Sequence, residues 1–247
     1  GSASLYNCTL DGTNLEGTPV GIQALGSTLK LNMTDIVHFE GGGVSVSAGG
    51  VDIDGGTLRG NGAVPTATFG GLQVGRSDGG GDAHVTVTNA RIEENGYARE
   101  SCTDLVCVRG GALRVIGGRV VLRSGTLLTR NHAFEGNSIY VDTSLVTSMS
   151  DAVSYELPVP RGHYVIITDR GAISPLSMAI IDEAYPFGCA AGRVGHADDN
   201  DRTAQSTPRC GGSCPAGHYC DVATIDPILC SNGTYCPRGS SAEHQCP

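Results

Sequence analysis

A repeating pattern of short strands constrains the fold of this chain more than any other feature. Residues 110–141 contain a glycine pair, several short alternating segments, an asparagine, and then a further glycine and strand. Apolar residues that alternate over so few positions are typical of half-buried β-strands. Short strands repeated as a unit predict a solenoid, because one unit cannot bury its own apolar face and must stack on the next.

The same unit recurs towards the beginning of the chain. VDIDGGTLRGN (51–61) and VTVTNARIEEN (85–95) share one spacing throughout, residues 120–131 repeat it with one extra residue, and residues 29–36 repeat its first part. First strands follow glycine at residues 41–46, 69–74, 110–115 and 135–141. The alignment predicts about five to six rungs. The residues expected to face inward are Ile22, Leu29, Ile36, Val44, Val51, Leu58, Leu72, Val85, Ile92, Leu113, Leu122 and Leu127.

Asn61, Asn95 and Asn131 occupy one position of this repeat. A coil of short strands turns sharply, and Asn adopts the left-handed backbone conformation of such turns better than most residues. The same position also allows the three side-chain amides to stack from rung to rung. The sequence leaves both roles open, turn former and stacked amide.

The pattern over residues 4–146 resembles the right-handed parallel β-helix of pectate-lyase-like proteins. Within it, N-x-A-x-x-G-x-x-I-Y at residues 131–140 is similar to the repeats of polymorphic outer-membrane proteins and their relatives on protist surfaces. The resemblance implies an all-β chain whose residues 1–146 form a right-handed, single-stranded parallel β-helix. It implies little about chemistry, because one fold hosts many functions.

The composition agrees with a turn-rich extracellular chain and excludes some partners. Among 247 residues there are 37 Gly and no Trp, and the net charge is −9 with Lys30 as the one Lys. An acidic chain lacks the basic surface that binds nucleic acid or anionic membranes. No apolar run reaches transmembrane length and no signal peptide opens the sequence, so we expect a processed chain, or a piece of a larger one, without a membrane span.

Cysteines and glycosylation sequons predict secretion. Ten Cys point to an oxidising compartment. Three N-glycosylation sequons, which begin at Asn7, Asn32 and Asn232, agree with an extracellular, cell-surface glycoprotein. Cys102 and Cys107 are expected to form a disulfide that closes a long loop at its base. A redox role is disfavoured, because their spacing differs from the C-x-x-C motif. Cys8 has no near partner, so it either pairs outside these residues or is buried as a small apolar side chain.

After residue 146 the repeat stops, and residues 147–209 are predicted to form a β-rich C-terminal cap and linker. A solenoid exposes its core at its end unless a cap covers it. The segment ends in an acidic loop, in which Asp198, Asp199 and Asp201 are candidate calcium ligands. The loop lacks the spacing and the closing Glu of an EF-hand, so a solvated loop is the favoured interpretation.

Residues 210–247 contain a tandem repeat of the form C-x-x-G-x-Y-C, as CPAGHYC (214–220) and CSNGTYC (230–236). This repeat resembles the ephrin-receptor-like cysteine-rich modules of secreted proteins in algae and other protists. We predict a small disulfide-rich module, because so short a segment has little core, and we disfavour zinc because C-x5-C lies outside usual zinc spacing. Spacing does not fix the pairing; the expected disulfides in this module are Cys220–Cys230 and Cys236–Cys246. The cysteines expected in disulfides along the whole chain are Cys102, Cys107, Cys189, Cys210, Cys214, Cys220, Cys230, Cys236 and Cys246.

Asp52 and Asp54 are the candidate catalytic residues. If the apolar residues of VDID face the core, both carboxylates point outward, where a pair can bind calcium or perform acid–base chemistry. A lyase acting on uronates also needs a cation, but Arg59 and Arg91 fall on third strands and do not converge on Asp52. The sequence has no polygalacturonase or mannuronan-epimerase motif, nucleophile elbow, H-E-x-x-H motif or aromatic sugar platform. Solvated strand carboxylates are therefore favoured.

We expect a non-catalytic structural or adhesive segment of a secreted glycoprotein in a cell-surface, wall or appendage assembly. The expected partners are other extracellular proteins or copies of the same chain, and cell-surface polysaccharide is left open. No cofactor is expected, with structural calcium as the open exception. The alternatives are a polysaccharide lyase, hydrolase or epimerase, or a carbohydrate-binding adhesin, acting through the groove around Asp52 and Asp54.

Overall fold

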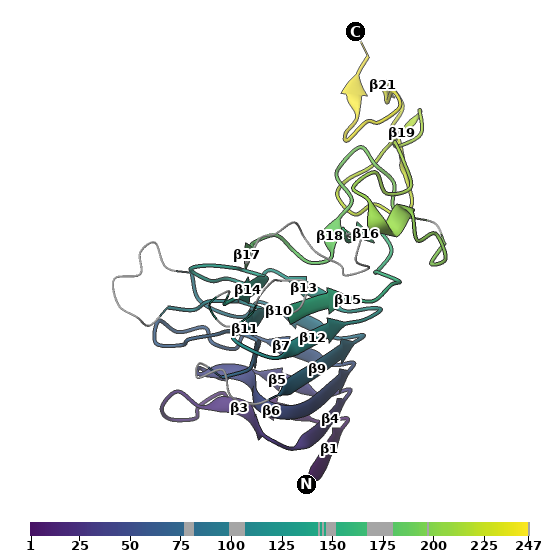
Figure 1. Ribbon diagram of the computed structural model, residues 1–247. Helices are drawn as coiled ribbons and strands as arrows, with labels where there is room; N and C mark the ends of the chain where they lie inside the picture. The colour runs from purple at the N-terminus through teal and green to yellow at the C-terminus, as the bar shows by residue number, and fades with distance from the viewer. Residues whose placement is uncertain are drawn as a thin grey trace.

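The computed structural model describes residues 1–76, 82–98, 107–142, 144, 146, 152–166, 180–196 and 198–246. Regular structure in these residues is almost entirely β, with one short 3-10 helix, η1 (Ala204–Ser206). Figure 1 shows the strands stacked one above another from β1, near the N-terminus, to β15, with a narrower module beyond them that ends at the C-terminus.

Two sheets hold the stacked strands, and their internal pairings are parallel except at β17. The strands of the larger sheet are β1 (Ser2–Tyr6), β3 (Val20–Leu25), β4 (Thr28–Asn32), β6 (Gly42–Asp54), β8 (Leu72–Val74), β9 (Ala83–Thr88), β11 (Leu113–Val115), β12 (Arg119–Leu122), β14 (Ile139–Val141), β15 (Val153–Tyr155) and β17 (Ile180–Ile181). Those of the smaller sheet are β2 (Thr9–Asp11), β5 (Asp35–Val37), β7 (Thr57–Arg59), β10 (Arg91–Glu93) and β13 (Leu127–Thr129). Each of the first five turns of the chain, which we call passes, therefore contributes to both sheets, and the last one, with β14 and β15, contributes to the larger sheet.

The parallel registers align apolar residues in columns that form the core. In the larger sheet Val51 pairs with Leu29 on one side and Val85 on the other, and Val85 pairs with Val120. Further columns run through Val44, Leu72, Leu113 and Ile139, and through Ile36, Leu58, Ile92 and Leu128. These side chains are buried, so each pass completes the apolar surface of the one before it.

One predicted core residue is displaced by a single position. The sequence alignment placed Leu127 inward, but Leu128 pairs with Ile92 and is fully buried, whereas Leu127 is half-buried. The extra residue of this pass lies in the turn between β12 and β13, before Leu127, and it shifts the alternation of side chains by one. A shift of one residue exchanges the two faces of a strand.

After β5, β7, β10 and β13 the chain turns sharply at a single residue, which precedes Phe39 in the first of these passes and the repeated asparagine in the other three. Four successive passes have a left-handed residue there: His38 (φ 60°), Gly60 (φ 65°), Glu94 (φ 57°) and Arg130 (φ 53°). The asparagines themselves do not have the left-handed conformation, because the backbone turns one residue before them. Of the two roles left open by the sequence, the stacked amide is therefore the one that the structure supports.

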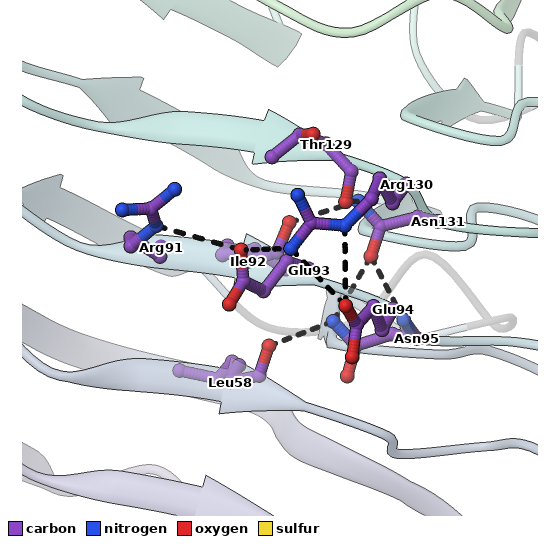
Figure 2. Close-up of polar contacts among 9 residues, drawn as sticks. All are labelled: Leu58, Arg91, Ile92, Glu93, Glu94, Asn95, Thr129, Arg130 and Asn131. Carbon is purple, nitrogen blue, oxygen red and sulfur yellow. Dashed lines mark hydrogen bonds and ion pairs between the residues drawn. The ribbon is translucent and has the colours of Figure 1, made fainter.

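The three asparagines form a buried ladder, and Figure 2 shows its step from Asn95 to Asn131. Asn61 Nδ2 donates to Oδ1 of Asn95, and Asn95 Nδ2 donates to Oδ1 of Asn131, each over 3.0 Å. Each Nδ2 also donates to a main-chain oxygen of the previous pass over 2.8 Å, so both of its protons are used. The ladder thus satisfies polar groups inside the stack and joins consecutive passes at one corner.

The last pass is covered by the segment that contains β17. β17 pairs antiparallel with β14, and Tyr185 exchanges main-chain hydrogen bonds of 2.8 and 2.9 Å with Leu128. The Tyr155 hydroxyl donates to the main-chain oxygen of Thr126 over 2.9 Å. Because Tyr155 and Tyr185 are both fully buried, their rings close the end of the apolar columns.

From residue 159 onward the chain forms four consecutive units of one local structure, which we name unit A (described over 159–166 and 180–188), unit B (described over 189–196 and 198–213), unit C (214–229) and unit D (230–245). The fourth residue of each unit is a left-handed glycine: Gly162 (φ 80°), Gly192 (φ 81°), Gly217 (φ 81°) and Gly233 (φ 86°). The residue after this glycine pairs antiparallel with the last residue of the unit. The strands of these pairings are β16 (His163–Tyr164), β18 (Phe187–Gly188), β19 (His218–Tyr219), β20 (Ile228–Leu229), β21 (Thr234–Tyr235) and β22 (His244–Gln245).

The disulfides of these units differ from the predicted pairing. Cys214 bonds Cys220 and Cys230 bonds Cys236, each across six residues, in place of the expected Cys220–Cys230 and Cys236–Cys246. The left-handed glycine folds each C-x5-C segment back on itself, which brings its two Cα atoms to 5.9 and 6.4 Å. Cys246 is an exposed free thiol. Each of these disulfides therefore closes one unit and joins no two units.

The series of units extends across the predicted linker. Cys189 bonds Cys210, so this disulfide spans the predicted boundary between residues 209 and 210. Unit A has no cysteine, and Val159 and Val165 occupy the positions that Cys214 and Cys220 hold in unit C. Both valines are fully buried, so unit A has two buried apolar side chains at the positions where units C and D have a disulfide.

Candidate functional site

The outward face of the larger sheet carries an open hollow of about 280 Å³ over β1, β4, β6, β9 and the end of β12. Its lining is mostly polar and consists of Tyr6, Lys30, Leu31, Asn32, Asp52, Ile53, Asp54, Thr86, Thr88 and Arg123. Both candidate catalytic residues, Asp52 and Asp54, belong to it. Along β6 they are exposed and alternate with buried Val51 and Ile53, which is the outward orientation that the sequence predicted.

The strand register places these side chains in two parallel columns. One column contains Lys30, Asp52 and Thr86 as cross-strand neighbours. The other contains Tyr6, Asn32, Asp54 and Thr88. Neighbouring strands lie about 4.8 Å apart, so each carboxylate has an amine or amide on one side and a hydroxyl on the other. Such a surface can donate and accept hydrogen bonds along an extended polar ligand.

The cation beside Asp52 is a residue that sequence reasoning missed. The arginines considered for this role, Arg59 and Arg91, lie on β7 and β10 in the smaller sheet and do not line the hollow. Lys30 is the cross-strand neighbour of Asp52 instead. The signal was present in the sequence, because LKLN (29–32) aligns with VDID (51–54) and so pairs Lys30 with Asp52.

Arg123 marks the other end of the hollow. Its Nε lies 2.8 Å from Oε2 of Glu156, and both side chains are about half exposed. An exposed pair of this kind contributes little to stability, so the Arg123 guanidinium remains able to exchange partners with an anionic ligand. The hollow thus has a lysine in its second strand, two carboxylates in its third and an arginine after its fifth.

A second charged cluster lies on the smaller sheet, beside the asparagine ladder (Figure 2). Arg130 Nη2 lies 2.9 Å from Oε2 of Glu93 and 3.1 Å from Oε1 of Glu94, and Arg91 Nε approaches Glu93 to 3.4 Å. Glu93 is largely buried, with 11% of its side chain exposed. The two arginines compensate the charge of this largely buried carboxylate. Because Arg130 comes from the pass after Glu93, the cluster is a contact between passes.

An exposed turn on the first two passes brings together Asp11, Thr13 and His38. Asp11 Oδ1 accepts hydrogen bonds from the Thr13 hydroxyl (2.6 Å) and the Thr13 N–H (2.9 Å), and His38 Nδ1 lies 3.2 Å away. The hydrogen bonds from Thr13, followed by the contact with His38, lower the pKa of Asp11. An Asp side chain that bonds the main chain two residues further on is a common way to stabilise a turn, and the contacts of Asp11 have this form.

The three calcium candidates do not converge on one point. Asp198 Oδ1 accepts hydrogen bonds from the N–H and the side-chain amide of Asn200, and Asp201 Oδ1 accepts one from the N–H of Ala204. Asp199 Oδ1 lies 3.9 Å from Nε2 of His196. Across the described ranges, no three His, Cys, Asp or Glu side chains gather in a metal-binding arrangement. The loop is thus ordered by its own hydrogen bonds.

His196 is a buried residue that the sequence had left without a role. Its side chain is fully buried, and neither ring nitrogen has a hydrogen-bond partner within the described part of the chain. Burial lowers the pKa of His196, although the nearby Asp199 acts in the opposite direction. The neutral imidazole is therefore favoured at neutral pH.

The sequons differ in how they are placed. Asn7 and Asn232 are exposed. Asn32 lines the hollow and is half-buried, and its sequon hydroxyl on Thr34 is buried and donates to the main-chain oxygens of Asn32 (3.1 Å) and Leu5 (3.4 Å). A glycan on Asn32 would occupy the hollow. Glycosylation at the three sites stays a prediction.

The remaining cysteines are only partly described. Cys8 is a half-buried free thiol whose Sγ lies 3.9 Å from the Thr34 hydroxyl, and both of its expected roles stay predictions. Cys107 is disulfide-bonded, and its predicted partner Cys102 lies outside the described residues.

No protein-family model matches this chain, and neither curated proteins nor solved structures provide a match. None of the described residues forms a helix with the length and apolar character needed to cross a bilayer.

Proposed function

We propose that this chain is a non-catalytic structural or adhesive segment of a secreted extracellular glycoprotein, built on a right-handed, single-stranded parallel β-helix. One observation carries the proposal: the parallel registers continue without interruption from β1 and β2 to β13 and β15, and buried columns and an asparagine ladder follow the same path. Repetition of this kind makes a stiff rod whose properties come from stacking, with no dependence on a single site.

Two further features support an extracellular scaffold. Three disulfides stabilise the described part of the C-terminal units, as expected for a chain that matures in an oxidising compartment. Large apolar side chains are exposed on the first two passes, including Tyr6 (62%) and Leu25 (74%). Exposed apolar groups of this size favour association with copies of the chain or with other extracellular proteins in a cell-surface, wall or appendage assembly.

The structural proposal is tested by fractionating native surface material without denaturant and following this chain by mass spectrometry. We expect it to migrate in high-mass particles that also contain other extracellular proteins or further copies. Recovery as a monodisperse monomer, with nothing co-purifying after mild cross-linking, would count against the proposal.

Carbohydrate binding or processing at the hollow is the second candidate function. The observation that favours it is the convergence of Lys30, Asp52, Asp54 and Arg123 on one open face, with Tyr6 at its edge. A lyase, hydrolase or epimerase would use Asp52 or Asp54 as its acid or base. An adhesin would use the same groups only as hydrogen-bonding and charged contacts.

A glycan array, together with incubation on pectate, alginate and sulfated glycans with and without calcium, separates these alternatives. Lys30→Gln and Asp52→Asn should abolish any binding or turnover at the hollow, whereas Arg91→Gln, on the other sheet, should leave it unchanged. Absence of both binding and product on every substrate would remove the second candidate. Release of product by the parent chain would overturn the non-catalytic proposal.

A further inference from the structure

Successive units at the C-terminal end are joined by the same set of main-chain hydrogen bonds. Units B and C are linked by Gly192 N–H to Cys220 O (2.8 Å), Ala223 N–H to Cys189 O (2.8 Å) and Gly195 N–H to Thr224 O (2.7 Å). Units C and D are linked by Gly217 N–H to Cys236 O (2.8 Å), Gly239 N–H to Cys214 O (2.8 Å) and Cys220 N–H to Ser240 O (3.1 Å). In both cases the fourth residue of one unit bonds the seventh residue of the next, the first bonds the tenth, and the seventh bonds the eleventh.

Unit D presents the same three groups without their partners. The equivalent groups are the N–H of Gly233, the oxygen of Cys230 and the N–H of Cys236, and none of them has a main-chain partner among the described residues. A next unit would supply two oxygens and one N–H at the positions that units C and D use. The end of unit D is therefore an unfilled copy of an interface that the chain has already made twice.

The glycines show the same difference between covered and uncovered units. A side chain at Gly162 or Gly192 would collide with the main-chain oxygen of Ala223 or Gly239, two units further on. Around Gly217 and Gly233, in contrast, the space is open. The first two units are thus covered by later units, and the last two have the same surface exposed.

Cys246 lies at the position where a next unit begins. It follows unit D as Cys214 follows unit B and Cys230 follows unit C, and its N–H donates to Gly233 O (3.3 Å) as theirs donate to Gly192 and Gly217. Cys214 and Cys230 both form disulfides with the cysteine six residues further on, whereas Cys246 is a free, exposed thiol. The main chain at Cys246 therefore makes the same hydrogen bond as the first cysteine of units C and D.

We propose that the free end of unit D is a docking surface for a further C-x-x-G-x-x-C unit of the same kind, in which Cys246 is the first cysteine. The unit would use its seventh and eleventh main-chain oxygens and its tenth N–H to bind Gly233, Cys236 and Cys230. Its disulfide forms from two thiols, which lose two protons and two electrons to a disulfide oxidant that is cleaved to two thiols. This inference rests on the repeated interface and is independent of the function proposed above.

The experiment extends the full chain after Pro247 with a copy of residues 216–229, because Cys246-Pro247 already matches Cys214-Pro215. After oxidation with glutathione disulfide, peptide mapping should show Cys246 bonded to the new cysteine six residues further on. Amide exchange at Gly233 and Cys236, measured by NMR, should slow at least tenfold relative to the parent chain. A matched control carries a scrambled extension that keeps only the cysteine, and it should leave exchange at these two amides unchanged.

A second variant tests the docking contact separately from the disulfide. Semisynthesis with L-lactate in place of the tenth residue of the added unit replaces the N–H that would bind Cys230 O with an ester oxygen and leaves the left-handed backbone of that position (φ 58° at Ala223) accessible. Protection at Gly233 should then fall several-fold although the disulfide still forms. Equal protection with the designed and scrambled extensions would overturn the proposal. Formation of Cys246-linked dimers by the designed extension, in place of the internal disulfide, would overturn it as well and assign this end to a second copy of the chain.

Discussion

The side-chain amide of Asn95 donates to Oδ1 of Asn131 over 3.0 Å, and the same Oδ1 accepts the main-chain N–H of Asn95. Asn131 Oδ1 therefore accepts hydrogen bonds from both the main-chain N–H and the side-chain amide of the asparagine in the pass before it. Asn95 does the same for Asn61. One residue per pass thus fixes the corner of the stack by direct contact with the next pass, and loss of one asparagine leaves unpaired groups in two passes.

Substitution of the central asparagine tests the ladder. Asn95→Ala removes the acceptor of Asn61 and leaves the main-chain oxygen of Leu58 without its side-chain donor, in a fully buried site. Buried groups without a partner cost about 1 to 3 kcal/mol each, so the free energy of unfolding should fall by about 2 to 5 kcal/mol. Chemical denaturation measures this. Asn14→Gly, at an exposed left-handed position, should change it by less than about 0.5 kcal/mol.

Gly50 in β6 and Gly71 immediately before β8 provide a matched test of how closely the passes stack. A Cβ at Gly71 would lie 2.6 Å from the side chain of Ile92 and 2.8 Å from the main-chain oxygen of Ala112, whereas a Cβ at Gly50 would meet nothing within 4 Å. Gly71→Ala should therefore destabilise the fold by about 1 to 3 kcal/mol through overpacking. Gly50→Ala should be neutral or slightly stabilising. Equal melting temperatures for the two variants would contradict the close stacking described here.

The C-terminal units should lose stability in mild acid because of His196. Its pKa is lowered by burial, so the unfolded chain takes up a proton near the ordinary value of 6.5, while the folded chain resists. Stability from this residue is thus fully present above about pH 6.5 and is lost as the pH falls towards the lowered folded value. His163 has a pKa lowered by burial in the same units and acts in the same direction.

Thermal unfolding between pH 7.5 and pH 5 measures this dependence. The groups that act on His196 are Asp199, Arg161, Asp201 and His163. Replacement by an apolar residue of similar size, His196→Leu, should flatten the pH profile of the C-terminal units. His84→Gln is the control, because the side chain of His84 is 61% exposed beside Asp82, and it should leave the profile as in the parent chain. An unchanged profile in His196→Leu would show that other groups govern the acid response.

Reduction should unfold the C-terminal units before the stacked sheets. Cys189–Cys210, Cys214–Cys220 and Cys230–Cys236 all lie in these units, and opening disulfides with loops of these lengths costs about 2 to 3.5 kcal/mol each. After mild reduction, hydrogen exchange should become fast over residues 189–246. Protection should remain at residues 51–58, 85–92 and 122–127, which depend on apolar stacking and strand pairing. If these segments become unprotected together with the tail, the two regions do not unfold separately.

The sequence predicted the parts of the fold that repeat with a constant spacing. Val51 and Val85 were aligned correctly because each lies ten positions before its asparagine, and stacked short strands followed from that pattern, whereas the parallel arrangement was what the family resemblance implied. Leu127 was misplaced because the extra residue of its pass falls in a turn, and periodicity alone does not locate an insertion within a turn. The sequence suggested that the asparagines stack, but it did not distinguish stacking from a role as turn formers, since stacking depends on distances between passes.

The C-terminal units show a different limit of the sequence. The cysteines identified units C and D, but unit A was missed because Val159 and Val165 replace the disulfide, although VPRGHYV (159–165) otherwise matches CPAGHYC (214–220). The pairing Cys214–Cys220 depends on the backbone reversal at Gly217, which spacing does not reveal. At the hollow, Asp52 and Asp54 were found as an isolated pair. Lys30 was missed because the alignment of LKLN (29–32) with VDID (51–54), which pairs it with Asp52, was used only to place core residues.

Electron cryo-microscopy of the native surface material tests the central claim most directly, namely that this chain is a structural segment of an extracellular assembly. The account predicts that the chain appears as a stack of parallel β-rungs with a right-handed turn, embedded in an ordered particle or filament and contacting neighbouring proteins or further copies. Isolated single chains in material prepared without denaturant, with a saccharide bound in the hollow beside Asp52 and Asp54, would contradict the claim and favour a carbohydrate-directed function.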